Sequence, residues 1–253
     1  MSSTHSARIE AARNNNGRHQ QPYQLLLPGQ QLDLHGCNTP ARAGVEGYIN
    51  QQFQVAYGAT ISDFLPLILT LSCNGKLGAV TGICPADSHP LFLEQYLSSS
   101  IEDEINRFSP QPVKRSSIAE IGNLAASRRG SSQLLFVLLA AILHRANFEW
   151  LAFTATPQVQ RTIRKLGFDL YPITEALPLQ ISNTSAQDWG SYYETKPMVV
   201  AGRLNDAMNT ITNHRVLKGM LSLYQPHIDV TANLISNLAT HENEYHAQHC
   251  FAA

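Results

Sequence analysis

The segment between residues 118 and 168 restricts the possible folds of this chain more than any other part of the sequence. It reads as a strand, a glycine-containing turn, an apolar helix, a second strand and a second helix: Ile118–Ala126, residues 127–132, Gln133–His144, Phe148–Thr154, and a helix that Thr156 and Pro157 begin and Gly167 ends. Thr at an N-cap followed by Pro is a typical helix start, and Gly is a typical stop. A strand, a helix and a strand in this order form a right-handed βαβ crossover with two parallel strands. We therefore expect an α/β domain.

The residues upstream predict antiparallel strands in the same sheet. Two apolar runs, Phe64–Cys73 and Leu77–Cys84, flank Asn74 and Gly75. An Asn-Gly pair between apolar runs is a strong hairpin signal, because both central residues of a type I′ turn need positive φ. The sheet is therefore expected to be mixed, with the apolar helix at 133–144 covering one face.

Two further helices are expected in the first half of the chain. Three apolar residues share one face of a helix over 41–56: Val45, Ile49 and Phe53. Their spacing is helical. Ser99–Phe108 has a capping serine and acidic residues in its first turn, as the helix dipole prefers. A short apolar segment, Pro90–Leu97, precedes it.

Composition divides the chain into three parts. Residues 1–24 are polar and without periodicity, which predicts a disordered leader, and residues 25–202 hold the α/β domain. Residues 203–253 predict a helical extension with a mobile tail, in which Pro226 separates two amphipathic helices. Their apolar faces suit packing on the domain, a membrane surface, or a homodimer through residues 203–240, which sedimentation can test.

Charge and composition argue against several classes of function. The formal net charge is -1 and 15% of the residues are charged, so no basic excess favours nucleic acid or anionic lipid. The longest apolar run, Leu134–Leu143, has ten residues, whereas a transmembrane helix needs about 20. The first residues lack the apolar core of a secretory signal. Because neither the cysteines nor the C-terminal histidines have metal-ligand spacing, we expect a cytoplasmic protein with reduced thiols and no metal.

The turn at residues 127–132 is a candidate anion site. A strand that ends in a glycine-containing turn and leads into a helix directs several backbone N–H groups to one place, and the helix dipole adds positive potential. Arg128 and Arg129 add bidentate donors that suit a pyrophosphate or the phosphate of phosphopantetheine. A solvated connection between the strand and the helix is the alternative explanation.

Glu120 and Gly122 are unusual residues for the strand that precedes this turn. A strand covered on both faces normally excludes glutamate, so Glu120 either meets a partner, such as a salt-bridging cation, or faces a cavity. Gly122 is a position where a β-bulge can form and open a gap to the neighbouring strand.

The chain resembles two related groups of proteins. Three consecutive stretches resemble the acyl-CoA-binding core of the GNAT acyltransferase superfamily: EIGNLAASRRGSSQLLFVLLAAIL, FEWLAFTAT and PQVQRTIRKLGF. More closely, roughly residues 40–202 are similar to the thermostable hemolysin family of bacterial proteins, in SDFLPLIL, PLFLEQYL, EIGNLA, FTAT, KLGF and WGSYY. EIGNLA is also similar to a stretch of acyl-homoserine-lactone synthases, a GNAT-like branch that takes acyl groups from acyl carrier protein. The resemblance implies a GNAT-like mixed, splayed β-sheet flanked by helices.

The resemblance further implies an N-acyltransferase that moves an acyl group from acyl-CoA or an acyl carrier protein to a small amine. The pantetheine arm would lie in the gap between the strands at 118–126 and 148–154, with its phosphate at the turn. Glu120 and Asn123 are the implied catalytic residues. Glu120 would face the acceptor amine, as a base that acts directly or through water or as the carboxylate that holds an amino-bearing substrate. The residues implied for donor binding are Ala125, Ser127, Arg128, Arg129, Gly130, Ser131, Ser132, Thr154 and Thr156.

Five further residues are candidates for substrate contact: Asp63, Glu94, Tyr96, Trp189 and Tyr192. The first three belong to elements that would border the acceptor side of the cleft. The aromatic residues at 189–193 suit the wall of an acyl pocket, and aromatic core packing is the alternative.

Two other functions stay open. The family's name suggests a membrane-active haemolytic effector, for which the helices after Gly202 are the exposed candidates. A non-catalytic acyl-carrier-binding module would keep the cleft and lack the base. Replacing Glu120 with Gln separates the module from the enzyme, because turnover falls by about two orders of magnitude if Glu120 is a general base.

Overall fold

The computed structural model describes residues 30–88, 90–127, 130–178 and 189–249, with side chains described as far as Leu238. In this part of the chain, seven strands form one sheet in the order β1-β2-β3-β4-β5-β7-β6. β4 and β5 run parallel, and the other neighbouring strands run antiparallel. The strands are β1 Gln30–His35, β2 Leu67–Cys73, β3 Lys76–Pro85, β4 Ile118–Ala126, β5 Trp150–Ala155, β6 Tyr171–Glu175 and β7 Met198–Arg203.

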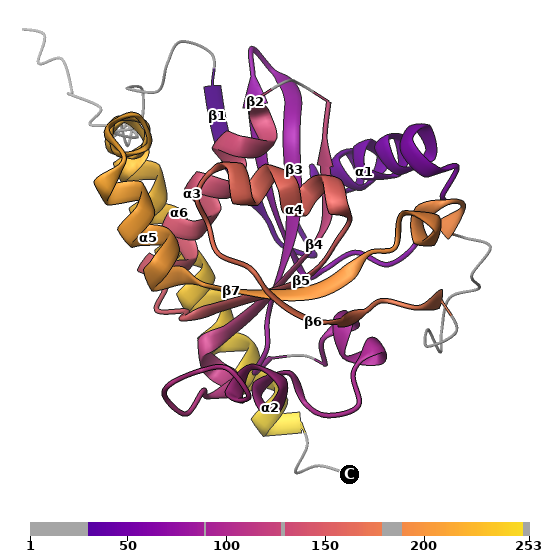
Figure 1. The fold of residues 1–253 in the computed structure, drawn as a ribbon. Coiled ribbons are helices and arrows are strands. Elements are labelled where there is room, and N and C mark those ends of the chain that lie inside the picture. Colours follow the sequence, from indigo (N-terminus) through magenta and orange to yellow (C-terminus); the bar gives the residue numbers. More distant parts are fainter. Residues whose placement is uncertain (1–29, 89, 128–129, 179–188, 250–253) are drawn as a thin grey trace, which may run out of the picture.

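Helices cover both faces of this sheet (Figure 1). The α-helices are α1 Arg42–Tyr57, α2 Ile101–Asn106, α3 Ser131–Arg145, α4 Pro157–Lys165, α5 Leu204–Asn213 and α6 Arg215–His249, and a 3-10 helix, η1, spans Phe92–Tyr96. One face packs against α3, α5 and α6 through residues such as Leu69, Ile121 and Phe153. On the opposite face, α1 packs over β2 to β4, and η1 and α2 pack beside it over β4, β5 and β7. The sheet is therefore the middle of three layers.

The predicted hairpin is formed by β2 and β3. Cys73 pairs with Lys76, and between them Asn74 and Gly75 have φ values of 53° and 71°. Both values lie in the left-handed region that a type I′ turn requires. The prediction from the Asn-Gly pair is confirmed.

The predicted crossover consists of β4, α3 and β5. Residues 135–143 of α3 are all buried, so this helix lies between the sheet and the C-terminal helices. The next helix, α4, begins as expected: Thr156 is its N-cap, and its Oγ1 accepts a hydrogen bond from Val159 N at 3.4 Å. Gly167, with φ of 81°, follows the end of α4, as the sequence predicts.

β4 and β5 separate halfway along their length. Their parallel ladder ends at the pair Ile121 and Phe153, although β4 continues to Ala126 and β5 to Ala155. At its other edge, β4 carries a bulge of one residue. Gly122 pairs with Gly82 of β3 and Ala125 pairs with Val80, so three steps along β4 match two steps along β3. A bulge bends its strand. β4 therefore diverges from β5 directly after the residues that pair with it.

The C-terminal helices divide at a different place from the one predicted. α6 contains Pro226, so the prediction that Pro226 separates two helices is wrong. The break lies at His214, whose φ of -98° and ψ of 110° leave the helical region, and whose Nδ1 accepts a hydrogen bond from Leu217 N at 3.4 Å. Proline removes one helical hydrogen bond, but Tyr224 and Ile228 on either side of Pro226 are buried, and this packing holds the helix together.

α6 also presents apolar side chains to solvent. The most exposed are Val216, Leu223 and Leu234, at 62%, 46% and 46% exposure. They are compatible with the predicted homodimer through residues 203–240, which stays a prediction. Among the described residues, no helix combines the length and the apolar composition needed to cross a bilayer.

The predicted fold class is confirmed: a mixed β-sheet that opens between two strands, flanked by helices and followed by a helical C-terminal extension. The helix expected over 41–56 is α1, and the one expected over Ser99–Phe108 is the shorter α2, with Ser100 as its N-cap. The sequence does not predict β1, β6 or β7. The leader predicted for residues 1–24 lies outside the described residues.

Candidate functional site

A cavity of about 680 Å³ lies where β4 and β5 separate. Residues 120–124 of β4 line it, as do residues at the end of β5 and the start of α4. The remaining lining comes from the end of α1, the loop that precedes β2, the start of η1, and the aromatic residues Trp189 and Tyr192. The cavity therefore connects the gap between the strands to the face of the sheet that α1 and η1 cover.

Glu120 is the buried acidic residue of this cavity. It is 3% exposed, and its two carboxylate oxygens accept hydrogen bonds from Phe92 N at 2.7 Å and Leu93 N at 3.0 Å. Burial raises the pKa of Glu120 to about 8, the two backbone hydrogen bonds oppose this rise, and the nearby charge of Glu94 adds to it. Each carboxylate oxygen keeps a further lone pair, so this group can still take a proton at a pH near neutrality.

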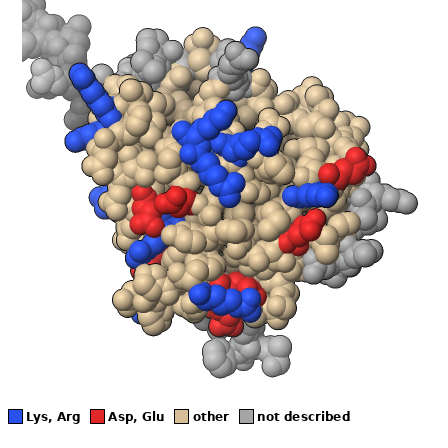
Figure 2. Space-filling model, viewed as in Figure 1, with Lys and Arg blue, Asp and Glu red and all other residues tan. Residues whose placement is uncertain are grey.

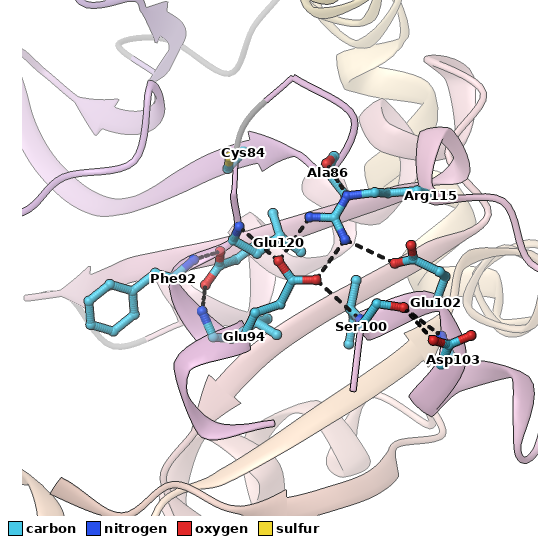
Figure 3. A network of polar contacts seen from close by, with 12 residues as sticks. Cys84, Ala86, Phe92, Glu94, Ser100, Glu102, Asp103, Arg115 and Glu120 are labelled. Carbon is cyan, nitrogen blue, oxygen red and sulfur yellow. Dashed lines mark hydrogen bonds and ion pairs between the residues drawn. The ribbon is translucent and has the colours of Figure 1, made fainter. Parts of the chain in front are cut away.

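The segment that holds Glu120 is fixed by a second carboxylate (Figure 3). Glu94 forms a bidentate ion pair with Arg115, with N–O distances of 2.6 and 2.8 Å. It also accepts hydrogen bonds from the backbone N–H groups of Leu91 and Ile101, each at 3.2 Å. Burial alone would raise the pKa of Glu94, but these hydrogen bonds outweigh burial and lower it. The two glutamates thus differ: Glu94 stays ionised, whereas Glu120 titrates close to neutrality.

Arg115 ties this network to the sheet. Its guanidinium also contacts Glu102 at 2.9 Å and donates to the carbonyl oxygen of Ala86 at 2.7 Å. Ala86 directly follows β3, so one side chain joins the end of β3, the start of η1 and the start of α2. This clamp sets the position of the two backbone N–H groups from which Glu120 accepts hydrogen bonds.

Asn123 occupies the bulge and binds the loop that precedes β2. Its φ is 49°, a left-handed conformation that asparagine tolerates better than most residues. Its side chain accepts a hydrogen bond from Leu65 N at 2.9 Å and donates one to the carbonyl oxygen of Asp63 at 3.0 Å. The structure therefore gives Asn123 a supporting contact at the edge of the cavity.

Two glycines let this loop approach the sheet. A Cβ at Gly82 would lie 2.9 Å from Leu65 Cβ, and one at Gly122 would lie 3.1 Å from Leu65 Cδ1. Leu65 therefore packs directly over the bulge. A larger residue at either glycine would push the loop away from the opening between the strands.

An aromatic wall closes the cavity on the side of α1. Trp189 and Tyr192 lie with ring centroids 5.3 Å apart, and Tyr192 lies 5.2 Å from Tyr57. Gly190 between them is required, because a Cβ there would come within 2.1 Å of the Tyr57 carbonyl oxygen. The wall is thereby fixed against the C-terminal end of α1.

Tyr96 extends this wall on the side of η1. It is buried, and its hydroxyl lies 2.7 Å from the hydroxyl of Tyr193. Burial, together with this hydrogen bond, raises the pKa of Tyr96 well above its usual value. It is therefore a neutral hydroxyl in the working range of pH.

The predicted phosphate site is described only in part. Gly130 has φ of 85° and precedes α3, whose first residues are Ser131 and Ser132. Ser127 N donates to the carbonyl oxygen of Gly78 at 3.1 Å, so the strand stays attached to β3 up to the turn. Arg128 and Arg129 lie outside the described residues.

A basic surface lies on α4, the helix whose N-terminal end borders the cavity. Arg161, Arg164 and Lys165 of α4 are exposed, and Figure 2 shows Lys and Arg side chains gathered over this helix. The N-terminal residues of the same helix, Thr156 and Val159, line the cavity. A ligand that leaves the cavity along α4 would therefore meet positive charge.

The structure brings half of the sixteen predicted site residues together. Eight of them line the one cavity: Asp63, Tyr96, Glu120, Asn123, Thr154, Thr156, Trp189 and Tyr192. Glu94 is instead part of the ion-pair network behind Glu120. Ala125 is buried in a pair with Val80 of β3, and Ser127 accepts a hydrogen bond from Tyr48 at 2.9 Å.

Sequence reasoning missed several residues of this site. Neither the backbone amides that bind Glu120 nor the clamp by Arg115 was expected, and Leu65 and Tyr57 were also missed. The signal for Glu120 itself was available, since a glutamate in a buried strand needs a partner. Of the alternatives left open for Glu120, the structure shows the cavity and not the salt bridge among the described residues, since its partners are two backbone N–H groups that lie 28 and 27 residues away.

Comparison with known proteins places these observations in a family. No curated protein sequence matches the chain. The chain is similar to three solved structures. An apo form of TofI has 12% identity and a TM-score of 0.49, and the match covers 74% of this chain and 99% of that chain. BjaI, a CoA-dependent acyl-homoserine lactone synthase with SAM and isopentyl-CoA, has 10% identity and a TM-score of 0.48, with 81% of this chain and 100% of that chain covered. FeeM, an N-acyl amino acid synthase from uncultured soil microbes, has 12% identity and a TM-score of 0.47, with 72% of this chain and 94% of that chain covered.

The family match rests on the sequence. The model of the thermostable hemolysin family matches residues 35–208. This range includes the whole of the cavity lining and both strands of the opening. The chain belongs to the thermostable hemolysin family.

Proposed function

We propose that this protein is an N-acyltransferase that transfers an acyl group from a pantetheine thioester to a small amine. One observation carries the proposal: β4 and β5 separate beyond Ile121 and Phe153, and the resulting cavity is lined by the buried carboxylate of Glu120. An extended pantetheine arm suits the gap, since strand edges that no longer pair with each other can pair with a ligand amide. The thioester then lies beside a base.

The chemistry needs a nucleophilic amine and a place for its proton. An amine enters largely as its ammonium form, and the Glu120 carboxylate takes up the proton that must leave. Its pKa of about 8 is close to the working pH, which favours general-base catalysis. The neutral amine attacks the thioester carbon, the C–N bond forms and the C–S bond breaks. The attacking nitrogen loses one further proton to become the amide, and this proton passes to the leaving thiolate, which becomes the free thiol.

Two features outside the cavity lining suit the phosphate that acyl-CoA and acyl carrier proteins share. The N-terminus of α3 at Gly130–Ser132 offers backbone N–H groups and a favourable dipole. Arg161 and Arg164 add exposed positive charge on α4, whose N-cap lines the cavity. Both features support a phosphorylated donor of either kind.

Measuring free-thiol release from an acyl-CoA or an acyl carrier protein in the presence of amines tests this proposal. Glu120→Gln should lower turnover by about two orders of magnitude, as expected for loss of a general base, and should leave donor binding unchanged. Glu104→Gln is the matched control, because Glu104 is equally buried, at 5%, but contacts Ser99 and Arg107 on α2 rather than the cavity. Equal turnover in the Glu120 variant and the wild type would contradict the role of Glu120 as the base, and donor binding without thiol release by the wild type would show that the protein does not act on the donor.

A further inference from the structure

Resting on the proposed function, we infer that the acceptor is an amine with an aromatic or similarly apolar body and without a carboxylate group. The inference comes from the charge, the aromatic content and one unpaired polar atom of the cavity described above.

Among the described residues, the cavity is lined by two carboxyl groups, those of Asp63 and Glu120, and by no lysine or arginine. Glu120 holds a proton near neutral pH when the cavity is empty, and a bound ammonium group favours its ionised form. The cavity therefore suits an ammonium group. A carboxylate on the acceptor would lose its hydration and gain no opposite charge, which is costly in a largely apolar cavity. Amino acids are thus poor acceptors here, and amines with the same body but no carboxylate are good ones.

The carboxylate of Glu120 lies beside a continuous series of aromatic rings. Phe92, whose N–H binds Glu120, has its ring centroid 5.9 Å from that of Trp189 and 6.2 Å from that of Tyr96. Trp189 continues to Tyr192 and Tyr57 at centroid distances of 5.3 and 5.2 Å for the successive pairs. An amine whose nitrogen meets Glu120 therefore places its body against aromatic faces. These faces favour apolar groups and, through cation–π attraction, the ammonium itself.

Trp189 supplies one polar atom with no hydrogen-bond partner among the described residues. Its indole Nε1 is buried and makes no hydrogen bond there, although buried N–H groups are nearly always paired. Trp189 lines the cavity, so a turn of its indole ring would bring this N–H to a ligand that supplies the acceptor. One neutral N–H group suits a hydroxyl or carbonyl oxygen of the ligand, and it does not compensate a buried carboxylate.

The test compares two ligands with the same body. Isothermal titration calorimetry measures binding of 2-phenylethylamine and of phenylalanine to the full-length protein near neutral pH. We expect 2-phenylethylamine to bind at least about tenfold more tightly, which corresponds to about 1.4 kcal/mol. Equal or tighter binding of phenylalanine, or no binding of 2-phenylethylamine, would overturn the inference.

Variants show where the preference arises. Glu120→Gln and Asp63→Asn should each reduce the preference for the amine, and Trp189→Phe should weaken binding of tyramine more than that of 2-phenylethylamine if the ring hydroxyl reaches the indole N–H. Glu104→Gln should leave all three affinities unchanged. A preference that persists in the Glu120 and Asp63 variants would contradict the assignment to this cavity.

The binding test and the turnover assay fail independently. Tight binding of 2-phenylethylamine without release of thiol would keep the inference about the ligand and overturn the proposed function. Release of thiol with phenylalanine as the preferred acceptor would do the reverse.

Discussion

The two halves of β4 are constructed in opposite ways. Residues 118–121 are paired on both edges, with β3 and with β5, and they carry a buried carboxylate whose oxygens are both hydrogen-bonded. Residues 122–126 lose β5, contain the bulge, and depend on Gly122 and on an asparagine with positive φ. The first half fixes a reactive group, and the second half makes room for a ligand.

This contrast separates two kinds of support. The paired half is stabilised by carboxylates of η1 and α2 and by a backbone carbonyl directly after β3, all of which meet at Arg115. The open half is stabilised by the loop that precedes β2, through the side chain of Asn123 and the packing of Leu65 over two glycines. Each kind of support can be removed separately.

The largest effect is expected in the paired half. Arg115→Met removes the bidentate contact to Glu94, a pair whose side chains are 30% and 22% exposed, and leaves a partly buried carboxylate with two backbone hydrogen bonds but no opposite charge. The free energy of unfolding should fall by about 2 to 3 kcal/mol, a value reduced from that of a fully buried pair for partial solvent screening. Urea unfolding measures it. Arg145→Met is the control, because its pair with Asp229 is 62% and 40% exposed and should contribute less than about 1 kcal/mol; equal losses in the two variants would contradict the clamp.

A smaller effect is expected in the open half. Asn123→Ala removes two hydrogen bonds to the loop and places alanine at φ of 49°, which should cost about 2 kcal/mol. Asn123→Gly should recover about 1 kcal/mol of this, because glycine adopts positive φ without strain. Thermal unfolding of the two variants measures the difference. If alanine were tolerated as well as glycine, the backbone of the bulge would not limit stability.

The smallest predicted change in the free energy of unfolding, counted per pH unit, comes from the titration of Glu120. Its pKa is raised from 4.5 to about 8 in the folded protein, so between these values the folded state holds a proton that the unfolded state has lost. The contribution of Glu120 to the free energy of unfolding is therefore greatest below pH 4.5. It falls as the pH rises towards 8, by about 1 kcal/mol for each pH unit. Urea unfolding at pH 5.5, 6.5 and 7.5 measures the decline. Glu120→Gln should flatten it, and an unchanged slope in that variant would show that another group titrates.

Local signals account for the part of the fold that the sequence predicts. Asn74 and Gly75 identify the hairpin through their backbone preference alone, and Thr156, Pro157 and Gly167 identify α4 through its two ends. These signals involve neighbouring residues, so they need no knowledge of the tertiary structure. Glu120 was identified for a related reason, since a charge in a buried strand is exceptional.

Long-range contacts account for the part that the sequence does not predict. The partners of Glu120 are main-chain groups, which carry no residue-specific signal. Arg115 contacts three segments that are far apart in the sequence. Strand β7 forms only because it lies between β5 and β6. The position of the break between α5 and α6 depends likewise on packing, which keeps Pro226 inside a helix and ends α5 one residue before His214.

The most direct test of the account is whether a pantetheine donor binds in the opening between β4 and β5. Thr154 lies beyond the last residue of β5 that pairs with β4 and lines the cavity, so Thr154→Trp should fill the gap. Calorimetric titration with octanoyl-CoA and with octanoyl acyl carrier protein measures donor binding. At least one donor should bind to the wild type and to the control variant Thr174→Trp, which lies on the edge strand β6. That binding should be lost in Thr154→Trp, whose fold should be intact by circular dichroism. Unchanged donor affinity in Thr154→Trp, or no binding of either donor to the wild type, would contradict the central claim.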